Sequence, residues 1–322
     1  MNGKPIVFSG SSNQELAKEI ARHLSIELGK TELKRFSDGE TLIKIEESVR
    51  GADVFIIQPT CSPSNETIME LLIFIDAVKR ASAEHITAVM PYYGYARQDK
   101  KLYAREPISA KLVSNLIETA GANRVLCLDL HSGAIQGFFD IPADNLSAMN
   151  LLAEFFGKKG VKNLVVVSPD AGGVKRAKKF SEIIGVDLAI INKFRPKENV
   201  AETIGVLGNV KEKNCIMVDD MIDTAGTLCA AAKTLKENGA KKIFACATHG
   251  IFSGEAFKKI NESDIDEVIV TDSVPLKRDA PGKITVLSIA PLIADAIKRI
   301  HSGKSISELF RKKDGKQLYL NT

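Results

Sequence analysis

Three aspartates and a run of small residues occupy one short stretch of the chain. Asp219 and Asp220 end an apolar segment typical of a buried strand, and Asp223 follows shortly after them. After them come the small residues Thr224, Ala225, Gly226 and Thr227, which lead into a segment with a helical pattern. Because the first N–H groups of a helix lack partners within it, a phosphate binds well at such a start. This stretch therefore predicts an anion site flanked by carboxylates.

The carboxylates restrict which ligand this anion site can accept. Three acids beside a phosphate would repel it unless the ligand also carries hydroxyl groups or a metal ion. A sugar phosphate meets this condition, since N–H groups and threonine hydroxyls take the phosphate and the acids take the ribose diol. An acidic turn that only caps a helix is the alternative interpretation of the same residues.

A second loop of the same kind follows another apolar run. It comes after Ser168 and contains Asp170, Ala171, Gly172 and Gly173. Its glycines let backbone N–H groups approach an anion closely, Asp170 could hold Mg²⁺, and Lys175 and Arg176 add positive charge. Two such loops predict a ligand with two separated phosphate groups. The alternative is a glycine-rich turn without a ligand.

Two cations follow a further strand-like run. Lys193 and Arg195 precede Pro196 in an expected loop. Cations on a mobile loop suit phosphoryl transfer, because its transition state spreads negative charge over several oxygens. A solvated basic loop is the alternative interpretation.

Polar and aromatic residues also mix in the N-terminal half. In the stretch 92–99, Arg97 and Gln98 follow tyrosines, and the segment could bind a base or form a packed turn. The stretch 35–40 around Gly39 is by itself typical of a β-turn. Asp129 and His131 lie two positions apart, and since Mg²⁺ prefers oxygen ligands, spacing alone favours a structural or capping role for His131.

Short apolar runs alternate with helical patterns along the chain, which predicts an α/β fold with mostly parallel sheets. Many of the runs are apolar on both faces, as buried parallel strands are. They cover 5–9, 53–58, 86–90, 124–130, 163–168, 187–191, 215–219, 242–248, 267–271 and 284–288. The helical patterns cover 14–28, 66–81, 109–120, 148–158, 173–184, 227–238 and 291–300. Since the alternation runs twice, we expect domains over 1–149 and 150–300 and a polar tail over 301–322.

Composition excludes several classes of protein. The net charge of +4 is too small to indicate nucleic-acid binding, and no apolar run approaches the ~18–20 residues that a membrane span needs. The first residues form no export signal and the five cysteines make no C-x-x-C pair, so we expect a reduced, cytoplasmic protein. No Walker A motif is present, because Lys298 stands where its first glycine would be.

Seven segments together resemble class I ribose-phosphate pyrophosphokinases (PRPP synthetases) over nearly the full length. In order they are 36–40, 95–99, 107–111, 129–140, 168–173, 193–199 and 218–227. Phosphoribosyltransferases share the last segment, so it does not by itself separate enzymes that make PRPP from those that consume it. Seven motifs in one order are far more specific than any one alone.

The resemblance implies two phosphoribosyltransferase-like α/β domains and the reaction ATP + ribose 5-phosphate → AMP + PRPP, which serves nucleotide, histidine and tryptophan biosynthesis. The implied ATP contacts are Phe36, Asp38, Gly39, Glu40, Arg97, Gln98 and Asp99. His131 and Asp170 would hold Mg²⁺, which overrides the interpretation of His131 from spacing, and Lys193 and Arg195 would stabilise the transition state. The implied ribose 5-phosphate site is Arg195, Asp219, Asp220, Asp223, Thr224, Ala225, Gly226 and Thr227. The implied diphosphate loop is Asp170, Ala171, Gly172 and Gly173.

The resemblance also implies an assembly and effectors. Members of this class are typically homohexamers, activated by phosphate and inhibited by ADP, with ATP reached partly from a neighbouring subunit. The implied regulatory residues are Ser48, Arg50, Ser305, Ser307 and Phe310. Asn192 and Phe194 depart from the residues that many members carry there, which concerns the dynamics of the loop rather than its chemistry.

Two other classes share parts of this pattern. A phosphoribosyltransferase that consumes PRPP would not need the 36–40 and 92–99 segments or the cationic loop, and formation of AMP from ATP would exclude it. A non-catalytic regulatory relative should have lost loop cations or acids, and none is missing here.

Overall fold

The structure, a computed structural model, describes residues 4–194 and 203–310. It divides into two compact units, each containing a mostly parallel sheet. The first unit holds the described residues up to Ser147, Ser273–Pro275 and the described residues from Ser288 onward. The second holds Ala148–Asp272 and Leu276–Leu287. The expected boundary near 149 lies close to the observed one, but the segment after Ser288, expected in the second domain, belongs to the first.

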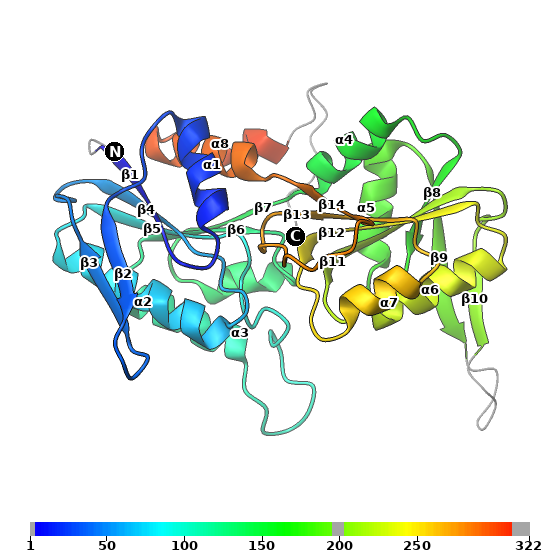
Figure 1. The fold of residues 1–322 in the computed structure, drawn as a ribbon, viewed down its shortest axis with the longest axis horizontal. Helices are drawn as coiled ribbons and strands as arrows, with labels where there is room; N and C mark the ends of the chain where they lie inside the picture. The colour runs from blue at the N-terminus through cyan, green and yellow to red at the C-terminus, as the bar shows by residue number, and fades with distance from the viewer. Residues whose placement is uncertain (1–3, 195–202, 311–322) are drawn as a thin grey trace. The chain divides into compact units, whose positions relative to one another are not determined.

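The first unit contains a five-stranded parallel sheet in the order β1-β4-β5-β6-β7 (Figure 1). Its strands are β1 (Pro5–Ser9), β4 (Asp53–Ile57), β5 (His85–Met90), β6 (Arg124–Leu128) and β7 (Ala143–Leu146). Every residue of β4 is buried, because helices cover its apolar side chains on both faces. A separate antiparallel hairpin joins β2 (Thr31–Arg35) to β3 (Thr41–Ile45).

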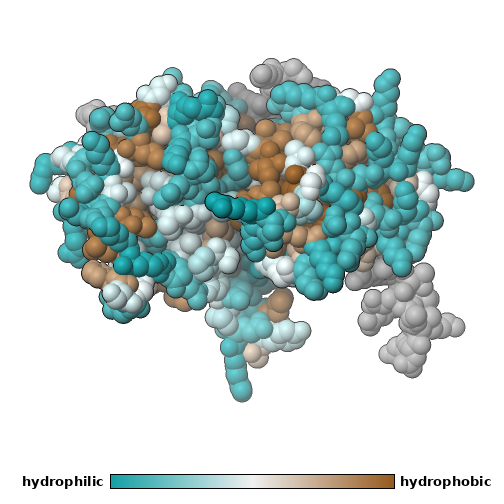
Figure 2. Space-filling model, viewed as in Figure 1, coloured by the Kyte–Doolittle hydropathy of each residue, from teal (hydrophilic) through white to brown (hydrophobic). Residues whose placement is uncertain are grey.

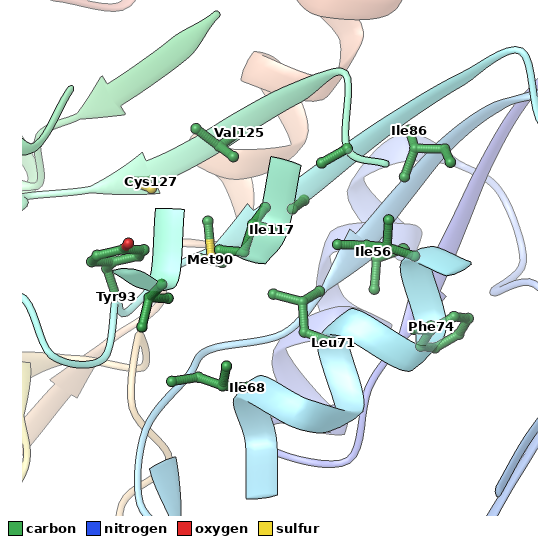
Figure 3. Close-up of a cluster of buried hydrophobic side chains, with 14 of the residues drawn as sticks. Ile56, Ile68, Leu71, Phe74, Ile86, Met90, Tyr93, Ile117, Val125 and Cys127 are labelled. Carbon is green, nitrogen blue, oxygen red and sulfur yellow. The ribbon is translucent and has the colours of Figure 1, made fainter. Parts of the chain in front are cut away.

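Helices lie on both faces of this sheet. They are α1 (Gln14–Leu24), α2 (Ser64–Arg80), α3 (Ser109–Ala120) and α8 (Ala290–His301), with short 3-10 helices η1 (Gly133–Phe138) and η2 (Ile306–Phe310). α1 and α8 lie side by side on one face, and α2 and α3 cover the other (Figure 1). Figure 3 shows part of the core on the second face, where Ile56 and Met90 of the sheet pack near Leu71 of α2 and Ile117 of α3.

Specific contacts hold α8 in the first unit. Its Lys298 Nζ donates to the carbonyl oxygen of His23 at 2.9 Å, and its His301 Nδ1 lies 2.9 Å from Asp53 Oδ2 at the start of β4. Ile293 and Ile297 of α8 are buried, as its helical pattern requires. α8 therefore packs on the sheet that contains β1, although most of the described chain separates the two elements.

The second unit contains a seven-stranded sheet in the order β10-β9-β8-β11-β12-β13-β14, in which only β10 is antiparallel to its neighbour among the described strands. The strands are β8 (Leu164–Ser168), β9 (Asp187–Phe194), β10 (Thr203–Leu207), β11 (Asn214–Ile222), β12 (Lys242–Gly250), β13 (Glu267–Thr271) and β14 (Ile284–Leu287). The helices are α4 (Met149–Lys159), α5 (Val174–Ile184), α6 (Gly226–Glu237) and α7 (Ala256–Glu262). α4 and α5 cover one face of the sheet, and α6 and α7 cover the other (Figure 1).

The predicted α/β class is confirmed, and every predicted strand and helix is present. The sequence missed β2, β3, β7, β10 and α7. Figure 2 shows hydrophilic residues over much of the visible surface of each unit. Within the described part of the chain, no helix combines the length and the apolar character that crossing a membrane would require.

Candidate functional site

The order of strands in the second unit creates a crevice between β8 and β11. β8 pairs with β9 on one side and with β11 on the other. The chain leaves β8 through α5 toward β9 and later returns to the opposite neighbour, so the loops after β8 and β11 diverge. In open α/β sheets, ligands bind outside the carboxyl ends of the strands at such a switch point. A hollow of ≈ 170 Å³ lies there, lined by Pro169, Asp170, Asp219, Met221, Ile222, Asp223, Thr224, Ala225, Gly226, Thr227 and Leu228.

The loop after β8 is fixed by its own aspartate. Asp170 Oδ1 accepts a hydrogen bond from the Gly173 backbone N–H at 2.8 Å, and Ser168 Oγ donates to the Asp170 carbonyl oxygen at 2.7 Å. A Cβ at position 173 would meet Ser168 Oγ at 3.1 Å, so glycine suits this turn. Ala171 and Gly172 are exposed. The loop thus presents backbone groups of glycine and alanine next to an acid.

The loop after β11 leads into the first turn of α6. Ala225, the residue before that helix, has a left-handed backbone with φ 59°, and its carbonyl oxygen accepts from the Cys229 N–H at 2.9 Å. The Asp223 carbonyl oxygen accepts from the Ser253 N–H at 3.1 Å. Thr224, Gly226 and Thr227 are exposed, so their polar groups remain accessible at the start of the helix. The predicted anion site therefore lies at an accessible helix start, and its role stays a prediction.

The paired acids of β11 are held by an arginine. Arg176 Nη1, on α5, lies 2.5 Å from Asp219 Oδ1 and 3.0 Å from Asp220 Oδ1. Asp220 is only 4% exposed. Burial and the adjacent Asp220 raise the pKa of Asp219, and Arg176 opposes that rise. Arg176 is therefore bonded to acids rather than available to an anion, which the sequence did not indicate.

The predicted diphosphate loop and the predicted ribose 5-phosphate acids thus belong to neighbouring strands of one sheet. Asp170, Asp219 and Asp223 line the same hollow as the residues 224–227. Asp220 does not line it, since its carboxylate is buried beside Arg176. Within this unit, the structure brings together residues that are about fifty positions apart in the sequence.

Lys193 lies in β9 rather than in the loop that the sequence predicted. It pairs with Ile204 of β10, so the strand continues through Phe194. The antiparallel partner β10, which the sequence did not reveal, stabilises this extension. Arg195 lies outside the described residues.

In the first unit, the segment 36–40 forms the turn between β2 and β3, as predicted. The Phe36 N–H donates to the Glu40 carbonyl oxygen at 2.8 Å, and Asp38 Oδ1 accepts from the Glu40 N–H at 3.1 Å. Gly39 has a φ of 94°, which favours glycine. Phe36 is 52% exposed, so its ring is accessible to a ligand or another chain.

The segment 92–99 combines a packed turn with exposed polar groups. Tyr92 and Tyr93 are buried, whereas Arg97 and Gln98 are exposed. Gln98 accepts from Ser109 Oγ, and its carbonyl oxygen accepts from the Ala110 N–H at 3.2 Å, so the segment is tied to the start of α3. Asp99 is half-buried. Both interpretations of this segment, a packed turn and a site that binds a base, therefore stay open, because its first half is packed and its second half is accessible.

His131 is exposed after β6. The preceding Asp129 has a φ of 38°, and its N–H donates to the Leu146 carbonyl oxygen at 2.8 Å. His131 belongs to the first unit and Asp170 to the second. Their predicted joint role in binding a metal ion stays a prediction.

The predicted regulatory residues belong to two segments of the first unit. Ser48 and Arg50 follow β3 and are exposed. Ser305 and Ser307 lie around the start of η2, which ends at Phe310, and the Ser305 carbonyl oxygen accepts from Arg299 Nη1 at 2.9 Å. Their regulatory role stays a prediction.

Comparison with known proteins identifies relatives of the whole chain. Residues 5–121 match the N-terminal domain of ribose phosphate pyrophosphokinase, and residues 192–311 match the phosphoribosyl synthetase-associated domain. The ribose-phosphate pyrophosphokinase of Oceanobacillus iheyensis is 55% identical, covering 94% of this chain and 96% of that protein. That of Caldanaerobacter subterraneus is 56% identical, covering 94% and 97%.

A solved structure extends the likeness to the fold. The phosphoribosylpyrophosphate synthetase of Mycobacterium smegmatis has a TM-score of 0.88 and 44% identity, covering 93% of this chain and 99% of that one. The matches span both units and include the segments around the crevice. The chain belongs to the ribose-phosphate pyrophosphokinase family.

Proposed function

We propose that this enzyme transfers the β,γ-diphosphate of ATP to the anomeric hydroxyl of ribose 5-phosphate, forming PRPP and AMP. Membership in the family supports the reaction. The observation that carries the proposal is the hollow between β8 and β11, where carboxylates border the start of a helix. A ligand that offers both a phosphate and hydroxyl groups satisfies this combination.

Ribose 5-phosphate is proposed to bind with its phosphate at the first turn of α6. The N–H groups there have no partners within the helix, and the hydroxyls of Thr224 and Thr227 add donors. Asp219 and Asp223 line the same hollow and can accept hydrogen bonds from the ribose hydroxyls. The loop of Asp170 to Gly173, which follows the neighbouring strand β8, is then proposed to bind the diphosphate.

The reaction forms one bond and breaks one. The anomeric oxygen attacks the β-phosphorus of ATP and loses its proton, and the bond between that phosphorus and the oxygen bridging to the α-phosphorus breaks, leaving AMP. Lys193 and Arg195 are proposed to stabilise the charge that spreads over the transferred oxygens. The proposed ATP contacts are Phe36, Asp38, Gly39, Glu40, Arg97, Gln98 and Asp99.

The donor set of the hollow fits Mg²⁺. Asp170, Asp219 and Asp223 supply carboxylate oxygens, the ligand type that this ion prefers. Within 4–194 and 203–310, no group of three or more acidic, histidine or cysteine side chains is arranged to hold a metal ion. The proposed ion would therefore take its other ligands from water and substrate phosphates, as Mg²⁺ commonly does. Asp170 and His131 are the proposed protein ligands, and the bound ion would offset phosphate charge.

Assembly and regulation are proposed from the family resemblance. We expect a homohexamer in which Phe36, Asp38 and Glu40 contact the ATP of a neighbouring subunit, with phosphate and ADP as effectors. The accessible position of Phe36 supports this assignment. We also expect a cytoplasmic location.

A coupled assay of AMP release with ATP, Mg²⁺ and ribose 5-phosphate tests the proposed function. AMP should form only when all three are present. If PRPP were instead consumed in the presence of a nucleobase and no AMP formed, the chain would be a phosphoribosyltransferase. If the ligands bound without turnover, the chain would be a regulatory subunit.

A further inference from the structure

Arg176 connects the two loops of the crevice, although it is not one of the residues proposed to bind a ligand. It is the third residue of α5, which begins directly after the loop of Asp170. Its Nη1 lies within 3.0 Å of carboxylate oxygens of both Asp219 and Asp220. The Arg176 side chain is 24% exposed, so water weakens these contacts less than on an open surface.

Two adjacent carboxylates in a partly buried place repel each other unless a cation lies between them. Asp219 Oδ1 also accepts a hydrogen bond from the Asp220 N–H at 2.9 Å. The contacts of Asp219 with Arg176 and with this N–H therefore both engage Oδ1, and together they fix the plane of the carboxylate. Asp219 is thereby held in a fixed place at the hollow that it lines.

Charge gives a second reason for the contact. Asp170, Asp219 and Asp223 line a hollow that is proposed to receive a phosphate. An unneutralised acid pair on β11 would raise the cost of bringing that phosphate in. Arg176 offsets this negative charge while leaving the first turn of α6 open.

We propose that Arg176 is a positioning residue for the sugar phosphate: it orients Asp219 and Asp220 and does not itself bind the phosphate. This inference rests on the proposed function, because it takes ribose 5-phosphate as the ligand of the hollow. It also assigns a role to α5, because the third residue of this helix links the loop after β8 to the acids of β11. This link holds the two loops in a fixed position relative to each other.

Arg176→Met tests the proposal, with Lys178→Met as its matched control. Lys178 lies on the same helix and is exposed, so its loss removes the same charge without touching the acids. Calorimetric titration with ribose 5-phosphate should show at least ~30-fold weaker binding for Arg176→Met, the effect of leaving a buried charge partner unpaired. ATP binding should change less than about threefold. Equal losses in both variants, or an equal loss for both ligands, would overturn the proposal.

A double variant separates positioning from direct contact with phosphate. In an Asp219→Asn background, Arg176 has one carboxylate fewer to hold, so Arg176→Met should weaken ribose 5-phosphate at least about threefold less than in the native background. Were Arg176 a phosphate ligand, its removal would cost the same factor in both backgrounds. Should Arg176→Met fail to fold, Arg176→Lys serves instead, since it keeps the charge but lacks the planar fork. Because titration measures binding alone, these results stand even if wild-type enzyme forms no AMP, which would refute the proposed reaction instead.

Discussion

Replacing Gly226 by alanine should stabilise the protein and weaken its ligand at the same time. Gly226 is exposed at the first position of α6, its φ is not positive, and an added Cβ would meet no heavy atom within 4 Å. Alanine at a compatible position restricts the unfolded chain, which stabilises the fold by about 0.4–1 kcal/mol. For a unit of this size, the melting temperature should rise by about 1–4 °C.

The same methyl group should obstruct the ligand. Gly226 lines the hollow, and glycine permits the closest approach of a phosphate to the backbone. We expect ribose 5-phosphate to bind at least about tenfold more weakly, which corresponds to ~1.4 kcal/mol. Calorimetric titration measures the affinity, and differential scanning calorimetry without ligand measures the stability.

Gly157→Ala is the matched control. Gly157 lies in α4 of the same unit, is exposed, and has space for a Cβ. It should give a similar gain in melting temperature with unchanged binding. If Gly226→Ala were stabilised and bound ribose 5-phosphate as tightly as wild type, the phosphate would not sit at the start of α6, and the reasoning would be wrong.

Three further predictions concern single side chains. Lys193→Ala should lower kcat by about 10²–10⁴-fold with a smaller change in KM, because a preorganised cation acts mainly on the transition state; steady-state kinetics would contradict this if KM alone changed. Asp223→Ala should weaken ribose 5-phosphate more than ATP in calorimetric titrations, and a loss selective for ATP would mean that the two sites are assigned the wrong way round. Burial and Asp220 raise the pKa of Asp219 to about 7, so the folded, ligand-free protein loses stability as pH rises from ~4, the usual carboxyl pKa, to about 7. Asp219→Asn should therefore flatten the fall in melting temperature between pH 4 and pH 8, and an unchanged profile would exclude this carboxyl as its source.

Much of the fold could be predicted because its strands are buried on both faces. β4 and β8 consist mainly of Val, Ile and other apolar residues, and short apolar runs of this kind can be recognised directly in a sequence. β2 could not be found in this way, since its sequence Thr-Glu-Leu-Lys-Arg is polar and its residues are only partly covered. β10 lies at the edge of its sheet, and the glycine within its sequence Thr-Ile-Gly-Val-Leu interrupts the apolar run.

The two loops of the site could be predicted from the sequence, but the fact that they lie next to each other could not. Asp170 and Asp219 each follow or end an apolar run, which is visible locally. Their meeting depends on β8 pairing directly with β11, and strand order is a property of the whole sheet. For the same reason, the positive charge of Arg176 was visible in the sequence but its acidic partners were not. The sequence pattern also assigned α8 to the wrong unit, because the contact of His301 with Asp53 spans most of the chain.

The most direct test of the central claim follows the phosphorus atoms of ATP. Phosphorus NMR of a reaction with ATP, Mg²⁺ and ribose 5-phosphate should show AMP and a sugar that carries an intact diphosphate on its anomeric oxygen. Both products should appear at equal rates, since one bond to the β-phosphorus forms as another breaks. Formation of ADP together with a sugar bearing only a second monophosphate would contradict the account, because the γ-phosphoryl group alone would then have moved.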